Sequence, residues 1–141
     1  MMDYEIHPLV GAGPFKFGMT SSEVKQIAHH SLGASDPMTI GGRQYFSSIG
    51  LFALYNEDNR LEALEFASPA APTLGGFRLI GVGFEAATAN LRSLGGDLED
   101  DPAGTTSHNL GVSLYAPGKK EDPLEPRESV LAFASGYYDA A

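Results

Sequence analysis

The sequence of 141 residues contains no cysteine, and this absence excludes disulfide bonds, thiolate zinc sites and cysteine nucleophiles. Long apolar segments are also missing, since no stretch approaches the roughly 18 consecutive apolar residues that a membrane-spanning helix needs. Residues 1–13 carry neither the basic nor the apolar segment of an export signal. Together these absences predict a cytoplasmic protein that does not associate with a membrane.

Basic residues are scarce. Nine Lys and Arg side chains stand against 18 Asp and Glu side chains, which gives a formal charge of −9. Proteins bind nucleic-acid backbones and anionic membranes through clustered Lys and Arg, so this balance argues against both as partners. It favours solubility and the long-range attraction of a basic protein partner. The length is that of one domain, and we expect residues 1–141 to form a single domain.

Two segments of the chain resemble each other. Residues 15–33 and 77–95 both begin with Phe and a basic residue, carry Glu at the same position and end in Ser-Leu-Gly. Shorter matches follow in the same order, since Leu54-Tyr55 corresponds to Leu114-Tyr115 and Phe66-Ala-Ser68 to Phe133-Ala-Ser135. The pattern predicts a duplication, with internal repeats at approximately 14–68 and 76–138 and an insertion within residues 116–128.

Each repeat has the signals of one helix followed by antiparallel strands. Thr20-Ser-Ser-Glu23 is a capping box that predicts the start of the first helix, and Gly33 is typical of a helix end. The second helix is expected at 84–94, and residues 69–73 are interpreted as a linker. Strands are predicted at 43–47, 51–56, 61–67, 105–108, 111–116 and 129–135. We therefore predict an α+β fold in which two tandem helix–antiparallel-strand repeats form one sheet with helices packed on one face.

Side chains alternate between the two faces of a strand, and we expect the larger apolar residues to face the helices. This reasoning predicts an inner face made of Phe52, Leu54, Leu64, Phe66, Val112, Leu114, Leu131 and Phe133. The opposite face would then carry Ala53, Tyr55, Ala63, Glu65, Ser113, Tyr115, Val130, Ala132 and Ala134. Because these side chains are small, mixed and include tyrosines, we expect water or a partner to cover this second face.

Two stretches of the first repeat resemble a known family. Phe17-Gly-Met-Thr-Ser-Ser-Glu-Val24 resembles the Gly-Met-Thr-x-x-Glu-Val start of the SmpA/OmlA lipoprotein family, and residues 51–66 resemble its strand–turn–strand hairpin. Two such units in tandem are similar in architecture to β-lactamase inhibitor protein, whose concave sheet grips its target. The chain lacks the lipobox cysteine, and Gly81-Val-Gly83 replaces Gly-Met-Thr in the second repeat. The resemblance thus implies a fold and a capacity to bind proteins, without the family's role in the cell envelope.

No motif in the sequence predicts catalysis, a metal or a cofactor. His29 and His30 are adjacent, so on a helix they point about 100° apart and do not chelate one ion. A Gly-x-Ser-x-Gly nucleophile motif is missing. The acidic residues 97–101 do not form a calcium loop of the EF-hand type, because Pro102 stands where such a loop needs Gly.

These observations favour a non-catalytic protein-binding module, and within that class an immunity or inhibitor protein that neutralises a toxin or an enzyme. Tyr55, Glu65 and Tyr115 are the predicted contact residues. The carboxylates predicted to steer a basic partner are Asp100, Asp101, Glu121 and Asp122. Two alternatives stay open: a small-ligand domain that holds its ligand between sheet and helices, and an enzyme with a dispersed acid/base pair such as Glu65 with His108.

Overall fold

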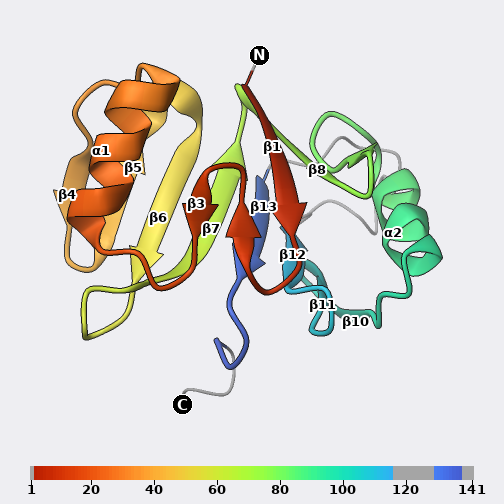
Figure 1. Cartoon of the computed structure of the whole chain (residues 1–141). Helices are drawn as coiled ribbons and strands as arrows, with labels where there is room; N and C mark the ends of the chain where they lie inside the picture. The colour runs from red at the N-terminus through yellow and green to blue at the C-terminus, as the bar shows by residue number, and fades with distance from the viewer. Residues whose placement is uncertain (1, 116–128, 138–141) are drawn as a thin grey trace.

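The computed structural model describes residues 2–115 and 129–137, which form two β-sheets and two α-helices (Figure 1). The eight-stranded sheet has the order β10-β11-β12-β13-β7-β6-β5-β4, and the five-stranded sheet has the order β3-β2-β1-β8-β9. The strands of the large sheet are β4 (Met38–Ile40), β5 (Arg43–Phe46), β6 (Leu51–Tyr55), β7 (Leu61–Ala67), β10 (Glu99–Asp101), β11 (Gly104–Ser107), β12 (Val112–Tyr115) and β13 (Ser129–Phe133). Those of the small sheet are β1 (Met2–His7), β2 (Gly11–Ala12), β3 (Phe15–Lys16), β8 (Ala70–Leu74) and β9 (Phe77–Arg78).

The predicted fold class is wrong, because most of the regular structure is β and a second sheet is present. Three strands of the second sheet are only two residues long, too short for an alternating pattern to be visible. The segment interpreted as a linker is largely β8, which pairs in parallel with β1 from Met2↔Ala70 to Glu5↔Thr73. Pro72 within β8 suppressed the strand prediction, since proline is rare inside sheets.

The large sheet consists of two antiparallel four-stranded units that meet at its centre. β4 to β7 pair in chain order, and so do β10 to β13. The units join where β13 pairs with β7, with Val130 opposite Phe66 and Ala132 opposite Leu64. The predicted strands therefore all exist, with 61–67 matching to the residue, and the same order of one helix followed by four strands occurs in both halves.

The helices begin and end close to their predicted positions. α1 (Ser21–Leu32) starts at the capping box, where the Glu23 amide donates to Thr20 Oγ1 at 3.3 Å and the Thr20 amide donates to Glu23 Oε1 at 3.0 Å. Gly33 ends it in the left-handed conformation, with a φ of 64°. α2 (Phe84–Ser93) has no side-chain cap, since Gly83 stands at its N-cap. Both the capping box and the glycine stop are confirmed.

The small sheet and the two helices cover the same face of the large sheet. Figure 1 shows β1 and β3 in front of β7 and β13, between α1 and α2. The ring of Tyr4 in β1 lies 5.1 Å from the ring of Phe66 in β7. The buried core joins residues from all these elements, among them Ile6, Phe15, Val24, Ala28, Phe46, Leu51, Leu79, Ala87 and Leu91. We call the covered side of the large sheet the inner face.

The predicted faces of two strands are wrong. Directly paired residues of antiparallel strands share a face. Because Ala53 pairs with Leu64, and Val130 pairs with Phe66, the inner face of β6 is Leu51, Ala53 and Tyr55, and that of β13 is Val130 and Ala132. Phe52, Leu54, Leu131 and Phe133 consequently lie on the other side. The predicted inner positions of Leu64, Phe66, Val112 and Leu114 are confirmed.

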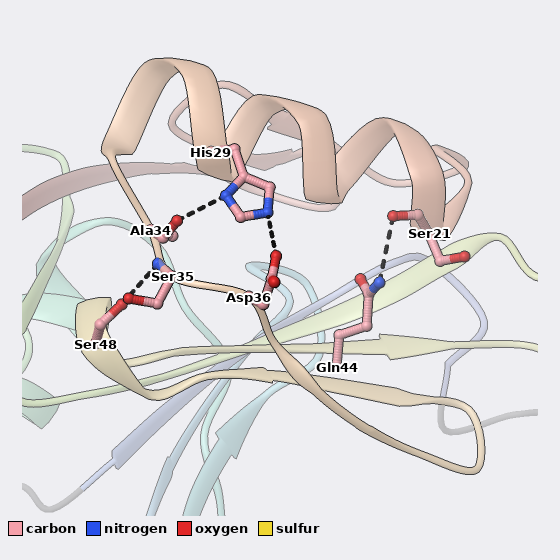
Figure 2. Close-up of polar contacts among 7 residues, drawn as sticks. All are labelled: Ser21, His29, Ala34, Ser35, Asp36, Gln44 and Ser48. Atoms are coloured by element: carbon pink, nitrogen blue, oxygen red, sulfur yellow. Dashed lines mark hydrogen bonds and ion pairs between the residues drawn. The ribbon is translucent and has the colours of Figure 1, made fainter.

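Polar contacts fasten α1 to the β4–β5 edge of the large sheet (Figure 2). His29 Nδ1 lies 2.7 Å from the carbonyl oxygen of Ala34, and His29 Nε2 lies 2.9 Å from Asp36 Oδ1. Farther along the helix, Gln44 Nε2 in β5 donates to the carbonyl of Ser21 at 3.4 Å. His29 therefore ties the end of the helix to the segment that enters β4, which is a structural role.

Candidate functional site

The second side of the large sheet is the candidate site, and we call it the outer face. Its central row contains one residue from every strand, joined by direct cross-strand pairs: Met38, Tyr45, Phe52, Glu65, Leu131, Ser113, Thr106 and Glu99. The helices and the small sheet all lie on the inner face. The row therefore runs across the side of the sheet that these elements leave uncovered.

One half of the outer face, over β4 to β6, is apolar and aromatic apart from Arg43, which pairs with Ile40 and Leu54. Met38 and Ile40 in β4 are 63% and 60% exposed. The rings of Tyr45 and Phe52 lie next to them, with centroids 5.4 Å apart, and both side chains are partly exposed. Large exposed apolar side chains that adjoin one another are typical of protein-binding surfaces.

The other half of the outer face contains a shallow hollow of about 330 Å³. Its lining residues are Glu65, Ser113, Tyr115, Ser129 and Leu131, from β7, β12 and β13. Leu131 pairs directly with both Glu65 and Ser113, and Tyr115 pairs with Ser129. The structure thus brings together two of the predicted contact residues, Glu65 and Tyr115.

Glu65 is a carboxylate in unusual surroundings. It is partly buried and stands between Phe52 and Leu131 in the central row. Within residues 2–115 and 129–137 its carboxylate takes part in no hydrogen bond or ion pair. A carboxylate without a cationic partner, set between apolar neighbours, is a position that a cation from outside would complement.

Carboxylates predominate around the hollow. Glu99 lies at the end of the central row, and Asp101 lies on the same face because it pairs with Gly104, which pairs with Tyr115. The five strands from β7 to β10 in the sheet order contain no Lys or Arg, and Arg43 in β5 is the only such residue in the eight strands of this sheet. Among the described residues, this half of the outer face therefore carries carboxylates and no Lys or Arg.

Tyr55 is not on the outer face, and the prediction that placed it there is wrong. Its side chain is 8% exposed and points into the core. The hydroxyl donates to Oε1 of Gln44, which is also buried. Burial raises the pKa of the Tyr55 phenol above its ordinary range, so the group stays neutral.

The predicted steering carboxylates have different surroundings. Asp100 and Asp101 are exposed on β10, at one edge of the large sheet. Asp101 Oδ1 accepts hydrogen bonds from the amides of Ala103 at 2.7 Å and Gly104 at 2.9 Å, so this carboxylate also closes the β10–β11 turn. Asp100 points to the opposite face from Asp101, because neighbouring strand residues alternate. Glu121 and Asp122 lie outside the described residues.

Several outer-face residues were missed by sequence reasoning, above all Met38 and Ile40. They belong to β4, which was not predicted. A signal existed, since Gly41-Gly42 between residues that favour strands is typical of a two-residue hairpin turn. Tyr45 was missed as a contact residue because its strand was not assigned a face. Phe52 and Leu131 were missed because their strands were assigned the wrong face.

Three further candidates from the sequence concern metal binding, acid/base catalysis and the acidic loop. No group of three or more His, Asp or Glu side chains there could hold a metal ion. Glu65 and His108, the pair considered for acid/base catalysis, line two different hollows. The Asp97 carboxylate already has hydrogen-bond partners within the chain. Its Oδ1 accepts hydrogen bonds from the Asn109 amide and from Ser107 Oγ, both at 3.1 Å. The hydrogen bond from the Asn109 backbone is the main reason that the pKa of Asp97 is lowered.

The space between the inner face and its cover is filled by large side chains. Tyr4, Phe15, Phe46, Phe66, Leu79 and Leu91 are all fully buried there. A small ligand held between sheet and helices would have to displace such residues. Within the described chain, no helix is both long enough and apolar enough to cross a bilayer.

Comparison with models of protein families, with curated proteins and with solved structures finds no match to this chain. The resemblance to SmpA/OmlA repeats and to β-lactamase inhibitor protein therefore stays a prediction.

Proposed function

We propose that this chain is a protein-binding module that docks its partner on the outer face of the large sheet. The observation that carries the proposal is the row of exposed Met38 and partly exposed Tyr45 and Phe52, which continues directly into the acidic hollow around Glu65. Met and aromatic side chains are enriched at the centres of protein interfaces. Such a face combines an apolar anchor with a charged region that selects the partner.

The charge of the chain narrows the class of partner. At −9, it is repelled by phosphate backbones and anionic lipids, and it attracts a basic protein surface. More specifically, we propose a partner enzyme or toxin whose working surface is blocked when the sheet covers it. The acidic half of the outer face would then oppose basic residues of that surface.

The proposal is tested with a pair of matched double variants. Met38→Asp/Phe52→Asp places two charges in the apolar half of the outer face. Val10→Asp/Phe77→Asp makes the same change at two exposed apolar residues outside that face. Circular dichroism establishes that both variants are folded. Each is then used, with the unmodified protein, for affinity capture from the native host followed by mass spectrometry.

The expected result is a stoichiometric partner that the unmodified protein and the Val10/Phe77 variant retain and the Met38/Phe52 variant loses. Charges introduced at the centre of an interface remain unpaired on binding, which typically weakens it by 2 kcal/mol or more, about a 30-fold effect. Failure to recover any stoichiometric partner, or equal recovery with all three proteins, would remove the proposal.

A further inference from the structure

We infer that the hollow formed by Glu65, Ser113, Tyr115, Ser129 and Leu131 receives one Arg or Lys side chain of the bound protein. The inference rests on the proposed function and specifies its recognition chemistry. Its starting point is Glu65, a partly buried carboxylate with apolar neighbours on both sides of its row and without a cation among the described residues. A basic side chain from outside would supply the missing counter-charge.

The walls of the hollow suit a long cationic side chain. Leu131, between Glu65 and Ser113 in the row, offers apolar surface to the methylene stem of such a residue. Tyr115 is 46% exposed and also lines the hollow, so its ring is accessible to a cation. At about 330 Å³ the hollow has room for one side chain rather than for a folded segment.

Hydroxyl groups around the carboxylate complete the site. Ser113 Oγ lies 2.9 Å from Thr106 Oγ1 and 3.4 Å from the carbonyl oxygen of Thr105, so the sheet itself orients this hydroxyl. Ser129, opposite Tyr115, is the second hydroxyl of the lining. Guanidinium groups present several N–H donors, which a carboxylate and two serine oxygens can accept together.

Anionic ligands are disfavoured at this hollow, because Glu65, Glu99 and Asp101 all lie on the same face.

The test uses arginine itself as the probe, in the form of N-acetyl-arginine methylamide. The ¹⁵N-labelled protein is titrated with this compound and, in parallel, with the citrulline analogue, which has nearly the same shape and no charge. Chemical-shift changes of the amides report where each compound binds. The expected result is a saturable change centred on Glu65, Ser113 and Leu131 with the arginine compound, and no saturable change with the citrulline compound.

Two variants assign the effect to the hollow. Glu65→Gln keeps the shape of the side chain and removes its charge, and we expect it to weaken binding about tenfold or more, as for loss of one charge-assisted hydrogen bond. Glu62→Gln makes the same change three residues away in β7, outside the lining of this hollow, and should alter binding less than about twofold.

The inference is overturned if the arginine compound does not saturate, if its shifts centre elsewhere, or if Glu65→Gln binds it as well as the unmodified protein does. These outcomes leave the protein-binding proposal intact, since that proposal is decided by the Met38/Phe52 variant. Conversely, a partner that is lost on Met38→Asp/Phe52→Asp and retained at full affinity by Glu65→Gln would support the docking face and reject the cation site.

Discussion

Replacing Tyr55 by Phe removes a single hydroxyl from the core and leaves the ring in place. That hydroxyl donates to Gln44 Oε1, and both side chains are inner-face residues, 8% and 6% exposed. Gln44 in turn donates from Nε2 to the carbonyl of Ser21 in the first turn of α1 (Figure 2). Tyr55 and Gln44 therefore link two strands of the large sheet to the helix above them.

The expected loss of stability follows from the unpaired acceptor that Tyr55→Phe leaves in the core. Gln44 Oε1 loses its donor at a buried position, and an unsatisfied buried acceptor costs about 1–3 kcal/mol. Tyr55→Phe/Gln44→Met removes both polar groups, so no acceptor stays unpaired. We expect this double variant to be less destabilised than the sum of the two single variants, with a coupling of roughly 0.5–3 kcal/mol.

Urea unfolding followed by circular dichroism measures these free energies. Thermal unfolding should show the same order, with a decrease in Tm of about 2–4 °C per kcal/mol for a domain of this size. Tyr45→Phe is the matched control, because Tyr45 lies on the outer face of the neighbouring β5 and should change stability by less than about 0.5 kcal/mol. A Tyr55→Phe protein as stable as the control would refute the inner position of Tyr55 and the corrected faces of β6.

Two further predictions concern backbone geometry and pH. Gly50 and Gly33 both have left-handed φ angles, 66° and 64°, but a methyl group at Gly50 would overlap the carbonyl oxygen of Ala67, whereas one at Gly33 meets nothing. We expect Gly33→Ala to cost about 1–2 kcal/mol and Gly50→Ala clearly more in urea unfolding, and equal costs would contradict the close approach of the chains. Burial raises the pKa of Tyr4 from 10.0 to about 12, so the folded state holds this proton more tightly than the unfolded state does. The resulting stability is fully present below pH 10 and decreases as the pH rises towards 12. We expect Tyr4→Phe to reduce this decrease. If the free energy of unfolding falls with pH equally steeply in the variant, Tyr4 does not cause the decrease.

The local signals in the sequence predicted local structure well. Thr20 and Glu23 are three residues apart, and their mutual hydrogen bonds depend on almost nothing outside the first turn of α1. Gly33 likewise ends the helix through its own backbone freedom. The strand at 61–67 was recognised because a polar turn and a change of pattern mark its start.

Part of the candidate site was predictable for the same reason. Glu65 and Tyr115 stand at positions where alternation with buried neighbours is clear, Leu64 and Phe66 for the first and Leu114 for the second. Tyr55 was misplaced because β6, Leu51–Tyr55, is apolar or aromatic at every position, so its sequence is compatible with either orientation. In such a strand a shift of one residue exchanges the two faces completely.

The amino-acid sequence by itself determined where the helices start and stop, where most strands of the large sheet run, and that the molecule is strongly acidic. Each of these properties depends on neighbouring residues or on composition. Only the tertiary structure decided that β1 pairs with β8, that this second sheet shares the cover of the inner face with the helices, and that Phe52 rather than Tyr55 points outward. Those outcomes depend on which distant strands pair, and the energy of that choice resides in contacts between residues that the order of the chain keeps far apart.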